Sequence, residues 1–133
     1  MILISVLDYQ QMIFVTNLGV NDMIGIFLDD ERNPEDVTWI NYPTGIEWVV
    51  VRTLNELISS IQSTNEEHCI SFDHDICDYD ISGRENTGYD CLKYVINHCL
   101  DINKKIPMCY FHTKNIIGLR NMMMFYENSL KYI

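Results

Sequence analysis

Four short apolar runs along the chain have the character of buried strands. They cover residues 24–28, 48–51, 69–72 and 108–111. Each is continuous and rich in β-branched or aromatic side chains, which is typical of strands that are covered on both faces of a parallel sheet. Three of the four runs stop where acidic or imidazole side chains begin, so the pattern predicts a sheet with such residues at one edge.

Helix-capping residues stand between these runs. Thr53 begins a capping-box pattern with Glu56, and Thr87 and Asn115 each precede a stripe of apolar residues at helical spacing. We therefore predict three helices, one after each of these caps. Strands that alternate with helices indicate a parallel sheet with right-handed crossovers.

Two further segments have weaker patterns. Asn33, followed by Pro34 and two acidic residues, predicts a short helix to about Tyr42. Residues 76–86 are polar and predict a long loop. Long loops in compact domains often act as lids, and a surface loop that never touches a ligand is an equal alternative.

Residues 1–22 precede the first predicted core strand. They hold two apolar stretches that are too short and too interrupted to cross a bilayer. We expect an N-terminal extension here, with a hairpin or an added edge strand as one form of it, and a single domain over residues 23–133. No Lys or Arg occurs before Arg32, so the start does not resemble a signal peptide, and we expect a cytoplasmic protein.

Composition narrows the function classes. The chain has 133 residues, 47% of them hydrophobic, which suits one globular domain with its own core. Nineteen acidic against nine basic residues give a net charge of −10. This charge argues against binding to bulk DNA, because phosphate backbones demand Lys and Arg. The five cysteines form no CxxC pair, and their odd number favours reduced thiols.

The ionisable residues at the ends of three strands form the candidate site. Ligands of open α/β sheets bind outside the carboxyl ends of the strands, so we expect these side chains to meet in one crevice. Carboxylates gathered there would repel each other without a cation, and oxygen ligands suit Mg²⁺ or Mn²⁺. The candidate metal ligands are Asp29, Asp30, Asp73 and Asp75.

The alternation of side chains along a strand limits these assignments. Asp29 and Asp30 cannot both point inward, so we expect one of them, together with Asp73, to bind the metal directly. His74 and His112 are the candidate catalytic residues, for proton transfer or contact with phosphate. Two imidazoles leave Mn²⁺, Fe²⁺ and Zn²⁺ open as well.

Several of these segments together resemble the cyclic-phosphate processing receiver domains. The resemblance covers about residues 23 to 130 and rests on 28–34, 71–75, 87–90 and 111–115, followed by Gly118, Asn121 and Met122. It implies an α/β fold of the three-layer, flavodoxin or receiver-like type with a mainly parallel central sheet. It also implies activity on a cyclic phosphate, such as a nucleotide or an RNA end. Thr113 stands where the family often has Ser, and Ile116 where Pro is common.

The chemistry that fits is metal-assisted hydrolysis of the cyclic phosphate. We expect the anion to be held by the start of the last helix and by Arg32, Thr113, Lys114 and Asn115. One alternative is a non-catalytic binder, such as a phage or plasmid protein that sequesters a cyclic nucleotide or masks a host protein. The other is a phosphoacceptor receiver that uses Asp73.

Overall fold

Four parallel strands form the central sheet of the computed structural model, which describes residues 23–64 and 67–131. The strand order is β2-β1-β3-β6. The strands are β1 (Met23–Leu28), β2 (Ile46–Val51), β3 (Glu67–Phe72) and β6 (Met108–Phe111). All four predicted strands are therefore confirmed, and the predicted extension over residues 1–22 lies outside the described residues.

The carboxyl ends of the strands are level with one another. Leu28 pairs with Val51 on one side and with Phe72 on the other, and Phe72 pairs with Phe111. The next backbone amide continues the ladder at three of these ends, with N···O distances between 2.9 and 3.1 Å. This register places Arg52, Asp29, Asp73 and His112 in one row across the edge of the sheet.

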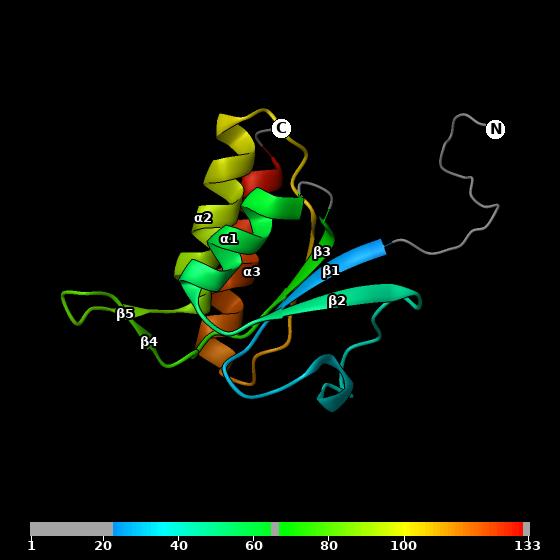
Figure 1. Ribbon diagram of the computed structural model, residues 1–133, viewed down its shortest axis with the longest axis horizontal. Helices are drawn as coiled ribbons and strands as arrows, with labels where there is room; N and C mark the ends of the chain where they lie inside the picture. The colour runs from blue at the N-terminus through cyan, green and yellow to red at the C-terminus, as the bar shows by residue number, and fades with distance from the viewer. Residues whose placement is uncertain (1–22, 65–66, 132–133) are drawn as a thin grey trace.

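Three helices cover one face of the sheet (Figure 1). They are α1 (Leu54–Thr64), α2 (Gly88–Asp101) and α3 (Ile116–Leu130). The apolar core lies between them and alternate strand residues such as Ile26, Leu28, Ile70 and Phe72, which are fully buried. Burial of this face is the main favourable contribution to folding.

The predicted helix starts are confirmed by their hydrogen bonds. The Thr53 hydroxyl accepts from the Glu56 amide at 3.1 Å, and the Glu56 carboxylate accepts from the Arg52 amide at 2.8 Å. Thr87 caps α2 and Asn115 caps α3 in the same way. Ile116 is the first residue of α3.

The other face of the sheet is covered in the described residues by an irregular segment, residues 33–45, that contains one 3-10 turn, η1 (Pro34–Asp36). The predicted helix to Tyr42 is therefore wrong. The turn ends because Val37 adopts an extended conformation and its side chain is buried. An extended path then lets Tyr42 pack edge-on against Trp48 and Tyr110 on the sheet.

Residues 76–86 contain a small hairpin rather than an irregular loop. β4 (Asp78–Tyr79) pairs antiparallel with β5 (Glu85–Asn86). The Asp80 carboxylate accepts from the amides of Ser82 and Arg84, and Gly83 supplies the positive φ of the turn. The hairpin projects from the start of α2, away from the sheet (Figure 1).

The structure also describes the state of the cysteines and the character of the helices. All five cysteines are free, and four of them are buried. Among the described residues, no helix has the length and apolar character that crossing a bilayer requires.

Candidate functional site

Asp29, Asp73 and His112 meet at the level ends of β1, β3 and β6. One ligand atom from each lies within 4.8 Å of the other two. The three side chains are almost inaccessible, with exposed fractions of 1%, 6% and 0%. Buried ionisable groups at such close range must be balanced by hydrogen bonds, by opposite charge or by a cation.

Asp29 is held by donors on both carboxylate oxygens. Oδ1 accepts from the backbone amides of Glu31 and Arg32 at 2.8 Å each, and Oδ2 lies 2.9 Å from His112 Nε2 and 3.3 Å from Arg32 Nη1. Burial by itself would raise the pKa of Asp29. The hydrogen bonds from His112, Arg32 and Glu31 outweigh burial and hold the pKa well below its usual range. Asp29 is therefore ionised at neutral pH.

His112 belongs to a buried chain of hydrogen bonds. Its Nδ1 lies 2.8 Å from Ser71 Oγ, and Ser71 Oγ lies 2.6 Å from the Tyr42 hydroxyl. Because Asp29 is ionised, it can only accept, so His112 Nε2 carries the proton. The Ser71 and Tyr42 hydroxyls can each donate or accept, so every link from Tyr42 to Asp29 can be satisfied.

This chain makes His112 a residue that orients Asp29. Both ring nitrogens are occupied, and the ring is stacked on Phe27 with centroids 4.4 Å apart. Ser71 and Tyr42, which the sequence pattern assigns no role, hold the ring in place through the hydrogen bond at Nδ1, on the side opposite Asp29. The signal for Ser71 was present, since it is the one hydroxyl in an otherwise apolar strand end. The irregular segment that carries Tyr42 gives no such signal.

Asp73 has the opposite electrostatic environment to Asp29. Its Oδ1 accepts from the His74 amide at 2.8 Å. Burial, followed by the negative charge of Asp29, raises the pKa of Asp73 despite that hydrogen bond. Two neighbouring carboxylates thus have pKa values shifted apart, an arrangement found at functional sites.

Around this pair lies an open pocket of about 290 Å³. Five acidic and two basic side chains line it, with a hydroxyl and an amide. The lining residues are Asp29, Asp30, Glu31, Arg32, Asp73, Asp75, Thr113, Lys114 and Asn115. All except Glu31 are candidate site residues from the sequence, while His74 and His112 do not line the pocket. The hairpin of residues 76–86 contributes no lining residue either, which favours the surface-loop alternative over a lid.

His74 lies beside the pocket, against the start of α3. Its Nδ1 is 3.0 Å from Asp75 Oδ1, and Asn115 Nδ2 donates to Asp75 Oδ2 at 3.0 Å. A Cβ atom on Gly118 would come within 2.5 Å of the His74 ring, so the helix approaches the imidazole closely. His74 therefore reaches the pocket through the carboxylate of Asp75 and, at 3.4 Å, through the side-chain amide of Asn115.

Two neighbouring segments fix the backbone of the site. The amide of Gly88, at the start of α2, donates to the His74 carbonyl at 2.7 Å, and a Cβ there would lie 1.7 Å from the Asp73 carbonyl oxygen. Arg52 donates to the carbonyls of Asp29 and Arg32 at 3.0 and 2.7 Å. The sequence pattern gave no role to Arg52, although this residue directly follows β2.

The residues of this pocket fit a hard divalent cation. Asp29 and Asp73 supply two buried carboxylates with oxygen atoms within 4.8 Å of each other, and Asp30 and Asp75 also line the pocket. Oxygen donors of this kind suit Mg²⁺ or Mn²⁺. Imidazole ligation is less favourable here, because both nitrogens of His112 already have partners.

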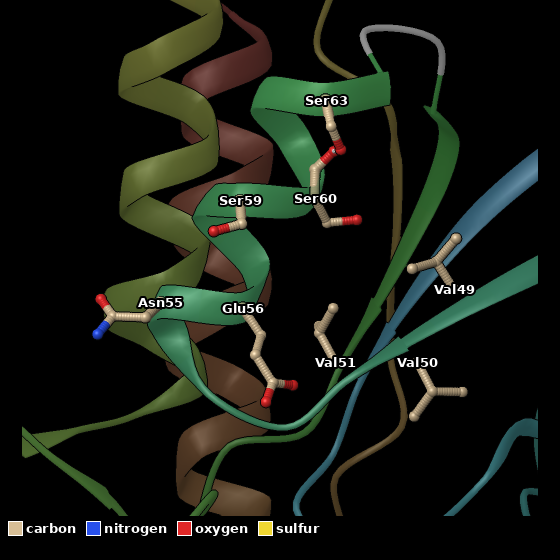
Figure 2. A pocket seen from close by; sticks show the side chains of 8 residues that line it. All are labelled: Val49, Val50, Val51, Asn55, Glu56, Ser59, Ser60 and Ser63. Carbon is tan, nitrogen blue, oxygen red and sulfur yellow. Dashed lines mark hydrogen bonds between the residues drawn. The ribbon is translucent and has the colours of Figure 1, made fainter.

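A larger pocket of about 480 Å³ lies elsewhere, between β2 and α1 (Figure 2). Its walls are valines of the strand and serines of the helix, and Figure 2 shows Val51 and Ser60 on facing walls. Glu56 is its one ionisable residue, and that carboxylate already accepts from the Arg52 amide. This pocket therefore offers fewer ionisable groups than the pocket at the carboxyl edge of the sheet.

Comparison with known proteins agrees with this architecture. The family model of the cyclic-phosphate processing receiver domain matches residues 24–128, from within β1 to within α3. The comparison with curated proteins gave no match, and the comparison with solved structures gave none. Because the family match covers most of the chain and every element of the site, this chain belongs to the cyclic-phosphate processing receiver domain family.

Proposed function

We propose that this chain is a metal-dependent phosphoesterase that opens a cyclic phosphate. The observation that supports it best is the pair Asp29 and Asp73, two buried carboxylates with opposite pKa shifts in one pocket. A divalent cation between them would relieve their repulsion. It would also favour the ionised form of Asp73 and so lower the pKa of that carboxyl. The family name, which links these domains to cyclic-phosphate processing, supports the same substrate class.

The chain's own residues have separate tasks in this proposal. Asp29 and Asp73 hold the cation, and the His112 hydrogen bond keeps the Asp29 carboxylate in one orientation. A bound Mg²⁺ or Mn²⁺ would supply charge stabilisation at the phosphoryl oxygens and an acidified water. Lys114 and Arg32, which carry the positive charges of the pocket lining, bind the phosphate with the N-terminal amides of α3.

The reaction is an in-line displacement at phosphorus. The oxygen of a water molecule forms a bond to phosphorus, one ring P–O bond breaks, and the leaving oxygen receives a proton, so the product is a phosphate monoester. Two pocket carboxylates are hydrogen-bonded to an imidazole, Asp29 to His112 and Asp75 to His74, and of these only Asp75 is not already assigned to the cation. We assign the transfer of the water proton to this pair, with His74 acting through Asp75.

The test is hydrolysis of 2′,3′-cyclic nucleotides by the full chain, followed by ³¹P NMR with Mg²⁺ or Mn²⁺ present. The proposal expects monoester formation that chelation by EDTA abolishes and that Asp73→Asn lowers at least a hundredfold. Asp101→Asn, at the exposed far end of α2, is the matched control and keeps full activity. No turnover across the panel, beside an active control enzyme, would contradict the proposal. Recovery of tightly bound but unaltered nucleotide would instead support the non-catalytic binder.

A further inference from the structure

Trp39 is an exposed aromatic side chain fixed at the edge of the acidic pocket. Its indole Nε1 donates to the backbone carbonyl of His112 at 3.0 Å, which attaches it to the end of β6. Even so, 41% of the residue is exposed. Exposure of a large aromatic ring that is held in place beside a polar site calls for a ligand-based explanation.

The two cations of the pocket lining both rest on this ring. Lys114 Nζ lies 4.2 Å from the ring centroid of Trp39, and Arg32 Cζ lies 5.5 Å from it. Within the described residues, Lys114 makes no ion pair, although five carboxylates line the same pocket. The indole thus keeps the ammonium group near the pocket without binding it to an acid. Such exposed cation–π contacts are weak and are readily exchanged.

We propose that Trp39 is a stacking platform for the base of the ligand, so that the site selects nucleoside cyclic phosphates over cyclic phosphates without a base. The phosphate draws Lys114 and Arg32 from the ring into the pocket, and the base takes their place on the indole. Base and phosphate positions are contiguous, since Lys114 lies within 4.2 Å of the ring centroid and also lines the pocket. The placement of the phosphate rests on the proposed function.

Stacking on a single indole distinguishes nucleotides from other phosphates but does not read the base. Every nucleobase has a π-face, so the platform accepts purines and pyrimidines alike. The net charge of −10 opposes a long RNA backbone beyond the terminal residue. We therefore expect a cyclic mononucleotide to bind at least as tightly as an oligoribonucleotide that ends in a 2′,3′-cyclic phosphate.

Calorimetry on the full chain with Mg²⁺ tests this proposal. The ligands are 2′,3′-cyclic AMP, a ribose 2,3-cyclic phosphate without a base, and a six-residue oligoribonucleotide with a cyclic phosphate end. Trp39→Ala should weaken binding of cyclic AMP about 10- to 100-fold and leave the base-free ligand within about twofold. Trp39→Phe, which keeps an aromatic face, should retain most of the affinity. Tighter binding of the oligoribonucleotide than of cyclic AMP would contradict the assignment to mononucleotides.

Fluorescence gives an independent reading of the same contact. The chain has two tryptophans, so Trp48→Phe leaves Trp39 as the single reporter. Cyclic AMP should quench this emission saturably, and the base-free ligand should not. If Trp48→Phe does not fold, the calorimetry of the Trp39 variants alone decides.

The outcomes separate this inference from the proposed hydrolysis. An equal loss of affinity for both small ligands in Trp39→Ala would overturn the stacking platform and leave Trp39 as a support for the two cations. Unchanged affinity would overturn it as well, as would failure of the wild-type chain to bind cyclic AMP. Base-dependent binding without turnover would support the platform and contradict only the hydrolase.

Discussion

His112 Nε2 lies 2.9 Å from Asp29 Oδ2, although 83 positions separate the two residues in the chain. Each residue directly follows a strand, and the register of β1, β3 and β6 brings them level. Both are buried, so the hydrogen bond is shielded from water, and the loss of either partner leaves a polar group without compensation.

The first prediction concerns this pair. His112→Phe keeps a stacked ring beside Phe27 but removes the hydrogen-bond partner of Asp29 Oδ2 and that of Ser71 Oγ. We expect it to lower the free energy of unfolding by about 3 kcal/mol, because a buried charge loses its partner. Urea unfolding at pH 7 measures this. Tyr42→Phe, which removes only the outermost hydroxyl of the chain, is the control and should cost about 1 kcal/mol.

A second prediction follows from the environment of Asp73. Burial and the charge of Asp29 raise the pKa of Asp73, so in the metal-free protein the ionised form destabilises the fold. A folded-state pKa above the unfolded value means that stability is lost as pH rises through that range. Asp73→Asn should therefore stabilise the metal-free protein by about 1 kcal/mol at pH 7.

This gain should shrink as pH falls toward the pKa of Asp73 in the folded protein, where the wild-type carboxyl becomes neutral. Chemical unfolding in EDTA at pH 7 and pH 4 gives both values. Asp101→Asn, exposed on α2, should show neither effect. A variant that is less stable than wild type at pH 7 would show that Asp73 is stabilised rather than strained by its surroundings.

The third prediction concerns Asp29, whose pKa is shifted in the opposite direction to that of Asp73. Hydrogen bonds hold the pKa of Asp29 below its unfolded value despite burial. The stability that this contributes is present above the unfolded pKa of about 4 and is lost as pH falls below it. Asp29→Asn should therefore flatten the fall in stability between pH 5 and pH 2 that the wild-type chain shows. An unchanged acid-unfolding curve in this variant would contradict the low pKa.

The fourth prediction tests how closely α2 approaches the site. A Cβ at residue 88 would lie 1.7 Å from the Asp73 carbonyl oxygen, so Gly88→Ala must displace either the helix or the Asp73 corner. We expect a loss of more than about 3 kcal/mol in the free energy of unfolding. Gly83→Asn is the control, because that turn has φ +85° and open space. Asn tolerates this conformation, so its cost should stay below about 1 kcal/mol.

Local patterns in the sequence were sufficient to predict the edge of the sheet. Apolar runs that stop just before Asp29, Asp73 and His112 are visible in the order of the residues alone, and a parallel sheet places such ends together. Alternation along an extended strand also predicts that His74 points away from its two neighbouring aspartates. In the structure the strand ends at Phe72, and the His74 ring packs on Gly118 but lies 3.0 Å from Asp75 Oδ1, so this prediction is wrong for Asp75.

The contacts that the sequence did not reveal come from a segment without the periodicity of a helix or a strand. Tyr42 reaches Ser71, and Trp39 reaches the carbonyl of His112, from an irregular segment that follows a single 3-10 turn. The helix predicted there failed because Val37 is buried in an extended conformation. Side chains placed by tertiary packing rather than by a helix or strand period cannot be read from spacing.

The most direct measurement is a crystal structure of the chain soaked with Mn²⁺ and a non-hydrolysable cyclic nucleotide analogue, with anomalous data collected for manganese. We predict an anomalous peak bound by Asp29 and Asp73, with the analogue's phosphate between that peak and Lys114. A manganese ion absent from this pocket at saturating concentration, or one bound only at surface acids such as Asp80, would contradict the metal-dependent site.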